Sequence, residues 1–363
     1  MTKEKDYQAF LKLVRLGVGR EVDGLPEGVD RTAVYDLAAK HGLTGVVLDG
    51  INQLKERNEK LKDEFIPKPD LLQWIGEVMQ EESQYDMQMK AAREMADLFR
   101  RNHIRTYVLK GVVISECYPE PRHRVGGDLD CFLLPVKGDF DAWTLGNDLM
   151  KANGYTVEDN FYKHSKFMMP YLTVENHQFM TAFRCNKWLR KMEIFLQGML
   201  KEDKGEDRII ESALLRPPVM VSALFIVEHA HAHFLSEGLS WRHVLDWQMF
   251  SARHKCEIDW GVFETLLDEF GLRKFYDSYA RLGCYLLGEL DYEHLTKRDI
   301  WMLEDVWTDI DVVENDKNLR GKLSLALKML RARWKYRYFS EMSMFHAMWI
   351  YVWGYLFVKN PKL

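Results

Sequence analysis

Residues 103–185 interrupt a chain that is otherwise patterned for helices, and this interruption constrains the fold more than any other feature. The stretch holds five short runs rich in β-branched and aromatic residues, whose length and flanks predict strands. These runs cover residues 104–109, 128–134, 155–158, 166–169 and 171–179. A helix predicted over residues 139–153 ends at Gly154. We therefore expect a small mixed β-sheet with helices packed on it.

Helical patterns occupy both sides of this core. Before it, apolar residues recur at helical spacing over residues 7–18 and 70–102, Asp30 is placed to cap a further helix, and residues 67–69 predict a linker. After it, the strongest helical patterns cover residues 219–235, 240–250 and 260–270. The sequence thus predicts an α+β chain with an N-terminal helical region (1–102), an αβ core (103–185) and a C-terminal helical region (186–363).

Charge and cysteine content exclude some classes of protein. The net charge of -5 arises from 50 basic and 55 acidic residues, so the chain has no global basic field of the kind that nonspecific nucleic-acid binding needs. The five cysteines are dispersed without a C-x-x-C pair, and the charged N-terminus lacks the apolar segment of a secretion signal. We expect reduced thiols and a cytoplasmic protein.

The C-terminal segment, residues 344–358, is apolar and aromatic and follows a basic run over residues 331–338. A helix that spans a bilayer needs about 20 apolar residues, and this segment is shorter and interrupted by His346 and Gly354. We favour a buried helix over an interfacial membrane helix. The basic run could bind RNA or anionic lipid, or form a solvated face over a buried one.

Asp128 and Asp130 flank Leu129 within an otherwise apolar run. Side chains alternate along a strand, so both carboxylates project from one face about 7 Å apart. Two like charges so placed are unfavourable unless a cation or hydrogen-bond donors compensate. Mg²⁺ or Mn²⁺ would do so, because these ions prefer hard oxygen ligands and complete their shell with water and substrate phosphates.

Further residues fit the same chemistry. Glu175 and His177 share a face of a later strand, so Glu175 is a candidate third metal ligand or base, and His177 contacts either a nucleotide or the carboxylates. Lys110-Gly111, at a strand-to-helix junction, would bind phosphate through a charge and closely approaching backbone. In the loop before Asp128, Arg124 is a bidentate phosphate donor and Gly127 would let the loop fold against a ligand.

A D-x-D segment alone is more often a solvated surface feature, and it is the order of the segments that is informative. In that order they resemble the uncharacterised nucleotidyltransferases, a family of the superfamily typified by the polymerase-β palm. The segments that carry the resemblance are Leu109-Lys110-Gly111, Tyr118-Pro-Glu-Pro-Arg-His-Arg124, Gly127-Asp-Leu-Asp130 and Val174-Glu-Asn-His177, followed downstream by His229-Ala-His-Ala-His233 and Trp241-Arg-His-Val-Leu-Asp246.

The resemblance implies a palm-like core and metal-dependent transfer of a nucleoside monophosphate from a nucleoside triphosphate such as ATP. The chain departs from the wider superfamily in having Val112 after Gly111 and in the 17 residues from Gly111 to Asp128, which make the proline loop an insertion. The acceptor is not implied; the acidic balance favours a small molecule or protein over RNA. The alternative is a catalytically silent module that binds nucleotide, a partner or a membrane.

His229 and His233 share one face of a predicted helix, while His231 points elsewhere. Two histidines so spaced can bind zinc, but a third protein ligand is needed. A second interpretation places His233, with Arg242 or Asp246, at the border of the active cleft. A third is a polar seam between two packed helices, in which Asp246 pairs with Arg242 or a histidine.

Overall fold

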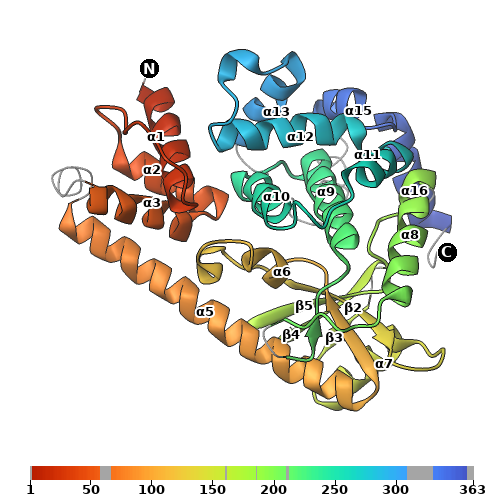
Figure 1. Ribbon diagram of the computed structural model, residues 1–363. Coiled ribbons are helices and arrows are strands. Elements are labelled where there is room, and N and C mark those ends of the chain that lie inside the picture. Colours follow the sequence, from red (N-terminus) through yellow and green to blue (C-terminus); the bar gives the residue numbers. More distant parts are fainter. Residues whose placement is uncertain are drawn as a thin grey trace.

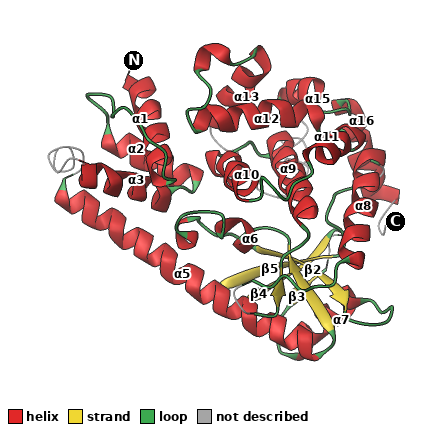
Figure 2. Ribbon diagram, viewed as in Figure 1, coloured by secondary structure: helices red, strands yellow, loops and turns green. Residues whose placement is uncertain are grey.

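The computed structural model describes residues 2–57, 67–159, 162–184, 186–209, 212–308 and 330–357. A mixed sheet lies between helices that precede it and helices that follow it in sequence (Figures 1 and 2). The prediction of an α+β fold with a small mixed sheet is therefore confirmed.

Three N-terminal helices pack together at one end of the molecule. They are α1 (Thr2–Gly17), α2 (Arg31–His41) and α3 (Thr44–Arg57). Asp30 caps α2 as predicted, because its carboxylate accepts hydrogen bonds from the backbone N–H groups of Thr32 and Ala33. Helices α1 and α3 cross so closely that a Cβ on Gly50 would lie 2.1 Å from the backbone oxygen of Leu13.

The long helix α5 (Lys68–Arg101) connects this group to the sheet along one edge of the molecule (Figure 1). The linker predicted over residues 67–69 is wrong in part, because Pro67 is the N-cap and the next two residues begin the helix. Proline is tolerated there, since the first N–H groups of a helix have no partner within the helix. The second half of α5, including Met95 and Phe99, packs on the sheet.

Six strands form one sheet in the order β3-β4-β5-β2-β1-β6. In chain order they are β1 (Ile104–Val108), β2 (Leu129–Pro135), β3 (Val157–Glu158), β4 (His164–Met169), β5 (Leu172–His177) and β6 (Leu214–Leu215). The five predicted strands are present, and β2 lies centrally, antiparallel to β1 and parallel to β5. Strand β6 was not predicted, because two residues give no readable period; it pairs in parallel with β1.

The two faces of the sheet are covered by different helices. Leu129 and Cys131 of β2 belong to a core formed with α5 and α7 (Ala142–Ala152). Phe132 belongs to a larger core that includes the C-terminal helices. Because successive side chains point to opposite faces, Asp130 projects toward these C-terminal helices.

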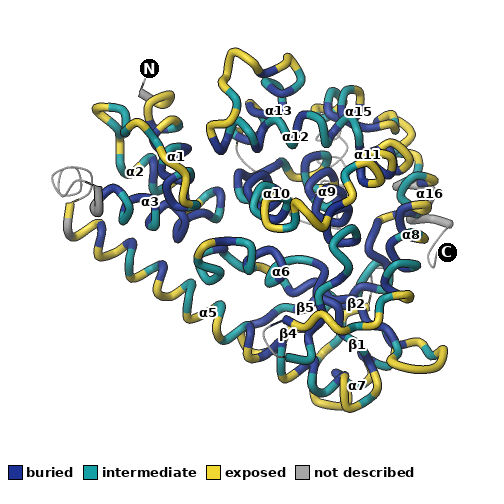
Figure 3. The backbone as a smooth tube through the Cα atoms, viewed as in Figure 1, coloured by how far each residue is buried: buried dark blue, intermediate teal, exposed yellow. Residues whose placement is uncertain are grey.

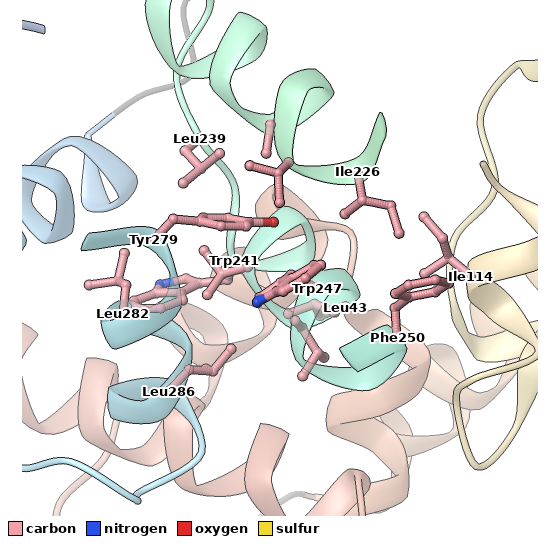
Figure 4. Packing of buried hydrophobic residues seen from close by; sticks show 14 of the residues in the cluster. Leu43, Ile114, Ile226, Leu239, Trp241, Trp247, Phe250, Tyr279, Leu282 and Leu286 are labelled. Atoms are coloured by element: carbon pink, nitrogen blue, oxygen red, sulfur yellow. The ribbon is translucent and has the colours of Figure 1, made fainter. Parts of the chain in front are cut away.

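Helices dominate the chain after the sheet. They are α8 (Lys187–Glu202), α9 (Val219–Ser236), α10 (Trp241–Arg253), α11 (Trp260–Glu269), α12 (Arg273–Leu286), α13 (Lys297–Trp307), α15 (Arg333–Phe339) and α16 (Met344–Phe357). Their inner faces are buried (Figure 3). Figure 4 shows Trp241 and Trp247 of α10 beside Tyr279 of α12, in a cluster that also contains Leu43 and Ile114. One core thus joins the N-terminal helices, the sheet region and the C-terminal helices.

Two apolar helices bear on membrane contact. Among the described residues, α9 is the helix whose length and composition would allow it to cross a bilayer, but 61% of it is buried in the protein, as expected of a core helix. The C-terminal helix was predicted to be buried, and this is wrong for two of its aromatic side chains. Phe345 and Trp349 of α16 are 64% and 61% exposed, whereas Met344 is buried. Helix α16 contacts α15. The side chains of residues 351–363 lie outside the description.

Candidate active site

Asp130 lies in the central strand with a side chain that is 2% exposed. One carboxylate oxygen, Oδ1, is 3.0 Å from His177 Nε2, and the other, Oδ2, is 3.3 Å from Lys110 Nζ. Within the described residues Oδ2 accepts no hydrogen bond of good geometry. Burial alone would raise the pKa of Asp130, but Lys110 and His177 lower it overall. Asp130 is therefore a buried carboxylate in its ionised form.

Asp128 precedes β2 by one residue, so the strand begins one residue later than predicted. Its Oδ2 accepts a hydrogen bond of 2.9 Å from Lys166 Nζ on β4. The same ammonium lies 3.6 Å from Glu175 Oε1. Lys166 thus bridges two of the three predicted metal-binding carboxylates.

Glu175 pairs with Asp130 in the parallel register of β2 and β5. Its Oε2 lies 3.5 Å from His164 Nδ1 and 3.7 Å from His177 Nε2. Burial raises the pKa of Glu175, and the negative charge of Asp130 raises it further. The fold therefore brings Asp128, Asp130 and Glu175 together on one face of the sheet, at an electrostatic cost that a bound cation would relieve.

His177 lies behind the carboxylates, with a side chain that is 1% exposed. Its Nδ1 is 3.1 Å from the carbonyl of Phe179, and its Nε2 is the nitrogen that faces Asp130. Both partners can only accept, so the ring donates from both nitrogens when both bonds form. Of the two predicted roles, this geometry corresponds to a partner of the carboxylates.

A cleft lies between the αβ core and helices α9 and α10. The polar residues and glycines that line the cleft are Lys110, Gly111, Arg124, Gly127, Asp128, His229, Arg242, His243, Asp246 and Tyr279. One cleft therefore contains a predicted metal ligand, Asp128, and four residues that were predicted to bind phosphate: Lys110, Gly111, Arg124 and Gly127.

Arg124 lines the cleft, but its guanidinium is already engaged. Nε and Nη2 donate to the two carboxylate oxygens of Asp246, each at 2.7 Å, and the Tyr118 hydroxyl donates to the same carboxylate at 2.8 Å. The prediction that Asp246 pairs with Arg242 or a histidine is therefore wrong, because its partner is Arg124. Arg242 instead donates from Nη1 to the carbonyl of Val125 at 2.6 Å.

Gly111 has a φ of 74°, in the left-handed region that favours glycine, and caps the one-turn helix α6 (Val112–Ser115). Lys110, immediately before it, lies 2.9 Å through Nζ from His229 Nε2 on α9. The backbone turn at Gly111 therefore places Lys110 between the buried Asp130 and the helices across the cleft.

Three residues of the site were not predicted: Lys163, His164 and Lys166. Lys163 is close enough for its charge to lower the pKa of Asp130. Burial lowers the pKa of His164 to about 3, with the charge of His177 adding to the effect. In the antiparallel register of β4 and β5, Lys166 faces Glu175 and His164 faces His177. The alternation of polar and buried residues along β4 could have indicated that His164 and Lys166 share a face of the sheet.

A sequence model of the family described as "Uncharacterised nucleotidyltransferase" matches residues 27–288, which is more than half of the chain. The matched region contains the three carboxylates, the cleft and helices α9 and α10. No curated protein and no solved structure gives a match.

Proposed function

Because the chain belongs to the family of uncharacterised nucleotidyltransferases, we propose that it transfers a nucleoside monophosphate from a nucleoside triphosphate to a hydroxyl or phosphate acceptor. The observation that carries this proposal is the convergence of Asp128, Asp130 and Glu175 from two adjacent parallel strands beside a cleft with cationic walls. Phosphoryl-group chemistry depends mainly on positioning and charge stabilisation, and this arrangement supplies both.

The residues present fit a divalent cation such as Mg²⁺ or Mn²⁺. Asp128, Asp130 and Glu175 would hold it, since they offer hard carboxylate oxygens. Among the residues that the structure describes, the buried Oδ2 of Asp130 has no hydrogen bond, and the pKa of Glu175 is raised by burial and by the negative charge of Asp130. When bound, such an ion supplies charge neutralisation to the phosphates and polarises the reacting phosphoryl group.

The chain's own cationic groups would bind and orient the triphosphate. Lys110 and Arg242 line the cleft, and both lie near its histidines. Gly127 is exposed, and a Cβ built on it would meet no atom within 4 Å, so this part of the loop is open to a ligand. In the alternative to metal binding, Glu175, whose pKa is raised by burial, would accept the proton of an acceptor hydroxyl.

The direct test supplies each α-³²P-labelled nucleoside triphosphate with Mg²⁺ and a cell extract, so that the acceptor need not be known. We expect protein-dependent labelling with the native chain and none with Asp128→Ala/Asp130→Ala. Asp148→Ala is the matched control, because Asp148 lies on the surface of α7 with a side chain that is 63% exposed. Equal labelling by the double variant would refute the proposal. The acidic net charge favours a small-molecule or protein acceptor over RNA.

A catalytically silent nucleotide-binding module is the first alternative, and calorimetry separates it from an enzyme. Titration with ATP, CTP, GTP and UTP in the presence of Mg²⁺ should give heat with at least one nucleotide. Binding without labelling of any acceptor would favour the silent module. Heat from none of the four would exclude both interpretations.

An interaction with membranes or partners is the second alternative, favoured by the exposed rings of Phe345 and Trp349. The neighbouring Arg331, Arg333 and Arg337 are exposed and would complement anionic lipid. Flotation with anionic liposomes tests this function. Binding that is lost on removal of residues 331–363 would support it, and an unbound native chain would contradict it.

A further inference from the structure

Three histidines meet at the wall of the cleft opposite the carboxylates. His229 and His233 are one turn apart on α9, and His243 comes from the first turn of α10. One ring nitrogen of each lies within 4.8 Å of those of the other two. We infer that His229, His233 and His243 form a binding site for a transition-metal ion of the Zn²⁺ type, separate from the carboxylate site.

The donor set matches the chemistry of zinc. Tetrahedral Zn²⁺ bound by imidazole nitrogens separates its ligands by about 3.4 Å, so the ring nitrogens, now within 4.8 Å of one another, would have to approach by at most about 1.4 Å. Each of the three residues is partly exposed. Three protein ligands and one open position form the arrangement of catalytic zinc sites. The open position here would face the cleft, which His229 and His243 line.

Helix α9 alone provides two metal ligands, His229 and His233, and His231 does not provide the third. The ring of His231 instead packs against Phe275, with centroids 5.0 Å apart. His243 completes the set from the next helix, where its ring stacks on that of His233 at 4.9 Å. The packing of α9 against α10 therefore creates a site that neither helix contains alone.

Hydrogen bonds already orient the rings. His233 Nδ1 lies 3.1 Å from Glu237 Oε2, a carboxylate–histidine pair of the kind that supports metal ligands. His243 Nδ1 lies 3.0 Å from the Ser240 hydroxyl and accepts a hydrogen bond of 3.2 Å from the Ser240 backbone N–H, which can only donate. The bond to Glu237 leaves Nε2 of His233 for a metal. In His243, a metal at Nε2 would require Nδ1 to give up the Ser240 N–H and donate to the Ser240 hydroxyl instead.

The ammonium group of Lys110 lies against the histidine cluster, where a bound metal ion would also place its positive charge. This ammonium can only donate, so the His229 Nε2 that lies 2.9 Å away accepts, and its lone pair points at Lys110. Asp130 Oδ2, 3.3 Å from the same ammonium, is a second partner to which Lys110 can turn. Binding of a metal at His229 would thus release Lys110 to an oxygen that has no hydrogen bond within the described part of the chain.

Imidazole suits Zn²⁺, whereas carboxylates suit Mg²⁺ and Mn²⁺. Because His164 and His177 lie beside Glu175 in a second group that could hold a metal, variants are needed to locate the ion. The test uses the full chain, stripped with a chelator and titrated with Zn²⁺ alone, and with Co²⁺ to report coordination by visible absorption. We expect one ion per chain and the intense bands of tetrahedral Co²⁺. No Zn²⁺ binding, or an octahedral Co²⁺ spectrum, would overturn the inference.

Variants locate the ion. His233→Ala and His243→Ala should weaken Zn²⁺ binding at least about 100-fold, and Glu237→Gln about 10-fold. The matched control is His254→Ala, which removes a histidine paired with Glu257 at the other end of α10 and should bind Zn²⁺ normally. Asp128→Asn/Asp130→Asn should keep Zn²⁺ binding, and its loss there would place the ion at the carboxylates and overturn the inference. His233 has a side chain that is 29% exposed, so its replacement tests the site without disturbing the core.

Discussion

Arg124 donates two parallel hydrogen bonds to Asp246, each of 2.7 Å, in a position where both side chains are almost completely buried. Coulombic attraction and hydrogen bonding to Asp246 raise the pKa of Arg124 despite the opposing effect of burial. The pair joins the loop that carries Asp128 to helix α10, across 122 residues of sequence. It therefore fixes the position of the candidate catalytic loop relative to the C-terminal helices.

Removing one partner of this pair should be strongly destabilising. Asp246→Ala leaves the Arg124 charge and the Tyr118 hydroxyl buried without their acceptor, and we expect a loss of about 3–5 kcal/mol in the free energy of unfolding. Denaturant unfolding measures it. Glu289→Ala is the control, because it breaks an exposed pair with Arg20 and should cost less than about 1 kcal/mol. Equal losses of unfolding free energy in Asp246→Ala and Glu289→Ala would show that breaking the buried pair costs no more than breaking an exposed one.

Lys166 should compete with a metal ion for Asp128 and Glu175, which it bridges. Lys166→Met removes a positive charge from a half-exposed position, so Mg²⁺ should bind roughly fivefold more tightly in the absence of nucleotide. Competition with Mn²⁺, followed by electron paramagnetic resonance, gives the dissociation constant. Lys151→Met is the control, since Lys151 pairs only weakly with Asp148 and Asp159. Unchanged or weaker Mg²⁺ binding in Lys166→Met would argue against a metal at these carboxylates.

His41 should make stability depend on pH. Burial lowers the pKa of this ring to about 3, whereas the unfolded chain titrates near the ordinary value of 6.5. Between these values the unfolded state binds the extra proton, so stability is complete above pH 6.5 and falls as the pH falls toward 3. The loss attributable to His41 at pH 5 is about 2 kcal/mol. Denaturant unfolding of native and His41→Gln chains at pH 7 and pH 5 should show the smaller loss in the variant, and identical losses would refute this assignment.

Two glycines should respond in opposite directions to alanine. At Gly50 the added Cβ would lie 2.1 Å from the Leu13 carbonyl oxygen, so Gly50→Ala should destabilise by at least about 1–3 kcal/mol. At Gly198, in α8, no atom lies within 4 Å of a built Cβ, so alanine should stabilise by about 0.5–1 kcal/mol through helix propensity. Thermal unfolding of both variants checks the pair. A stabilised Gly50→Ala chain would contradict the close crossing of α1 and α3.

The strands and the carboxylates were predictable because they have local signatures. A period of two along β2 and β5 identifies the face that Asp130 and Glu175 share, and the parallel register then sets them side by side. In β4 the same period would have indicated His164 and Lys166, had its polar face been considered. Strand β6 is too short for any period, and only its pairing with β1 defines it.

Contacts between distant segments were not predictable, because no local pattern encodes them. Arg124 was expected to bind phosphate, since its sequence neighbours do not reveal that Asp246 of α10 would reach it. The meeting of His243 with the histidines of α9 likewise depends on how two helices pack. Helix α16 shows the same limit, because the apolar composition of the segment did not reveal that Phe345 and Trp349 would be largely exposed.

We propose that the carboxylates of Asp128, Asp130 and Glu175 support transfer of a nucleoside monophosphate. One nucleoside triphosphate labelled at the α-phosphate is compared with the same nucleotide labelled at the γ-phosphate, each incubated with the protein, Mg²⁺ and a cell extract. We expect an acceptor to take label from the α position only, and Asp130→Asn to abolish this labelling. Label transferred from the γ position alone, or α labelling that persists in Asp130→Asn, would refute nucleotidyl transfer at these carboxylates.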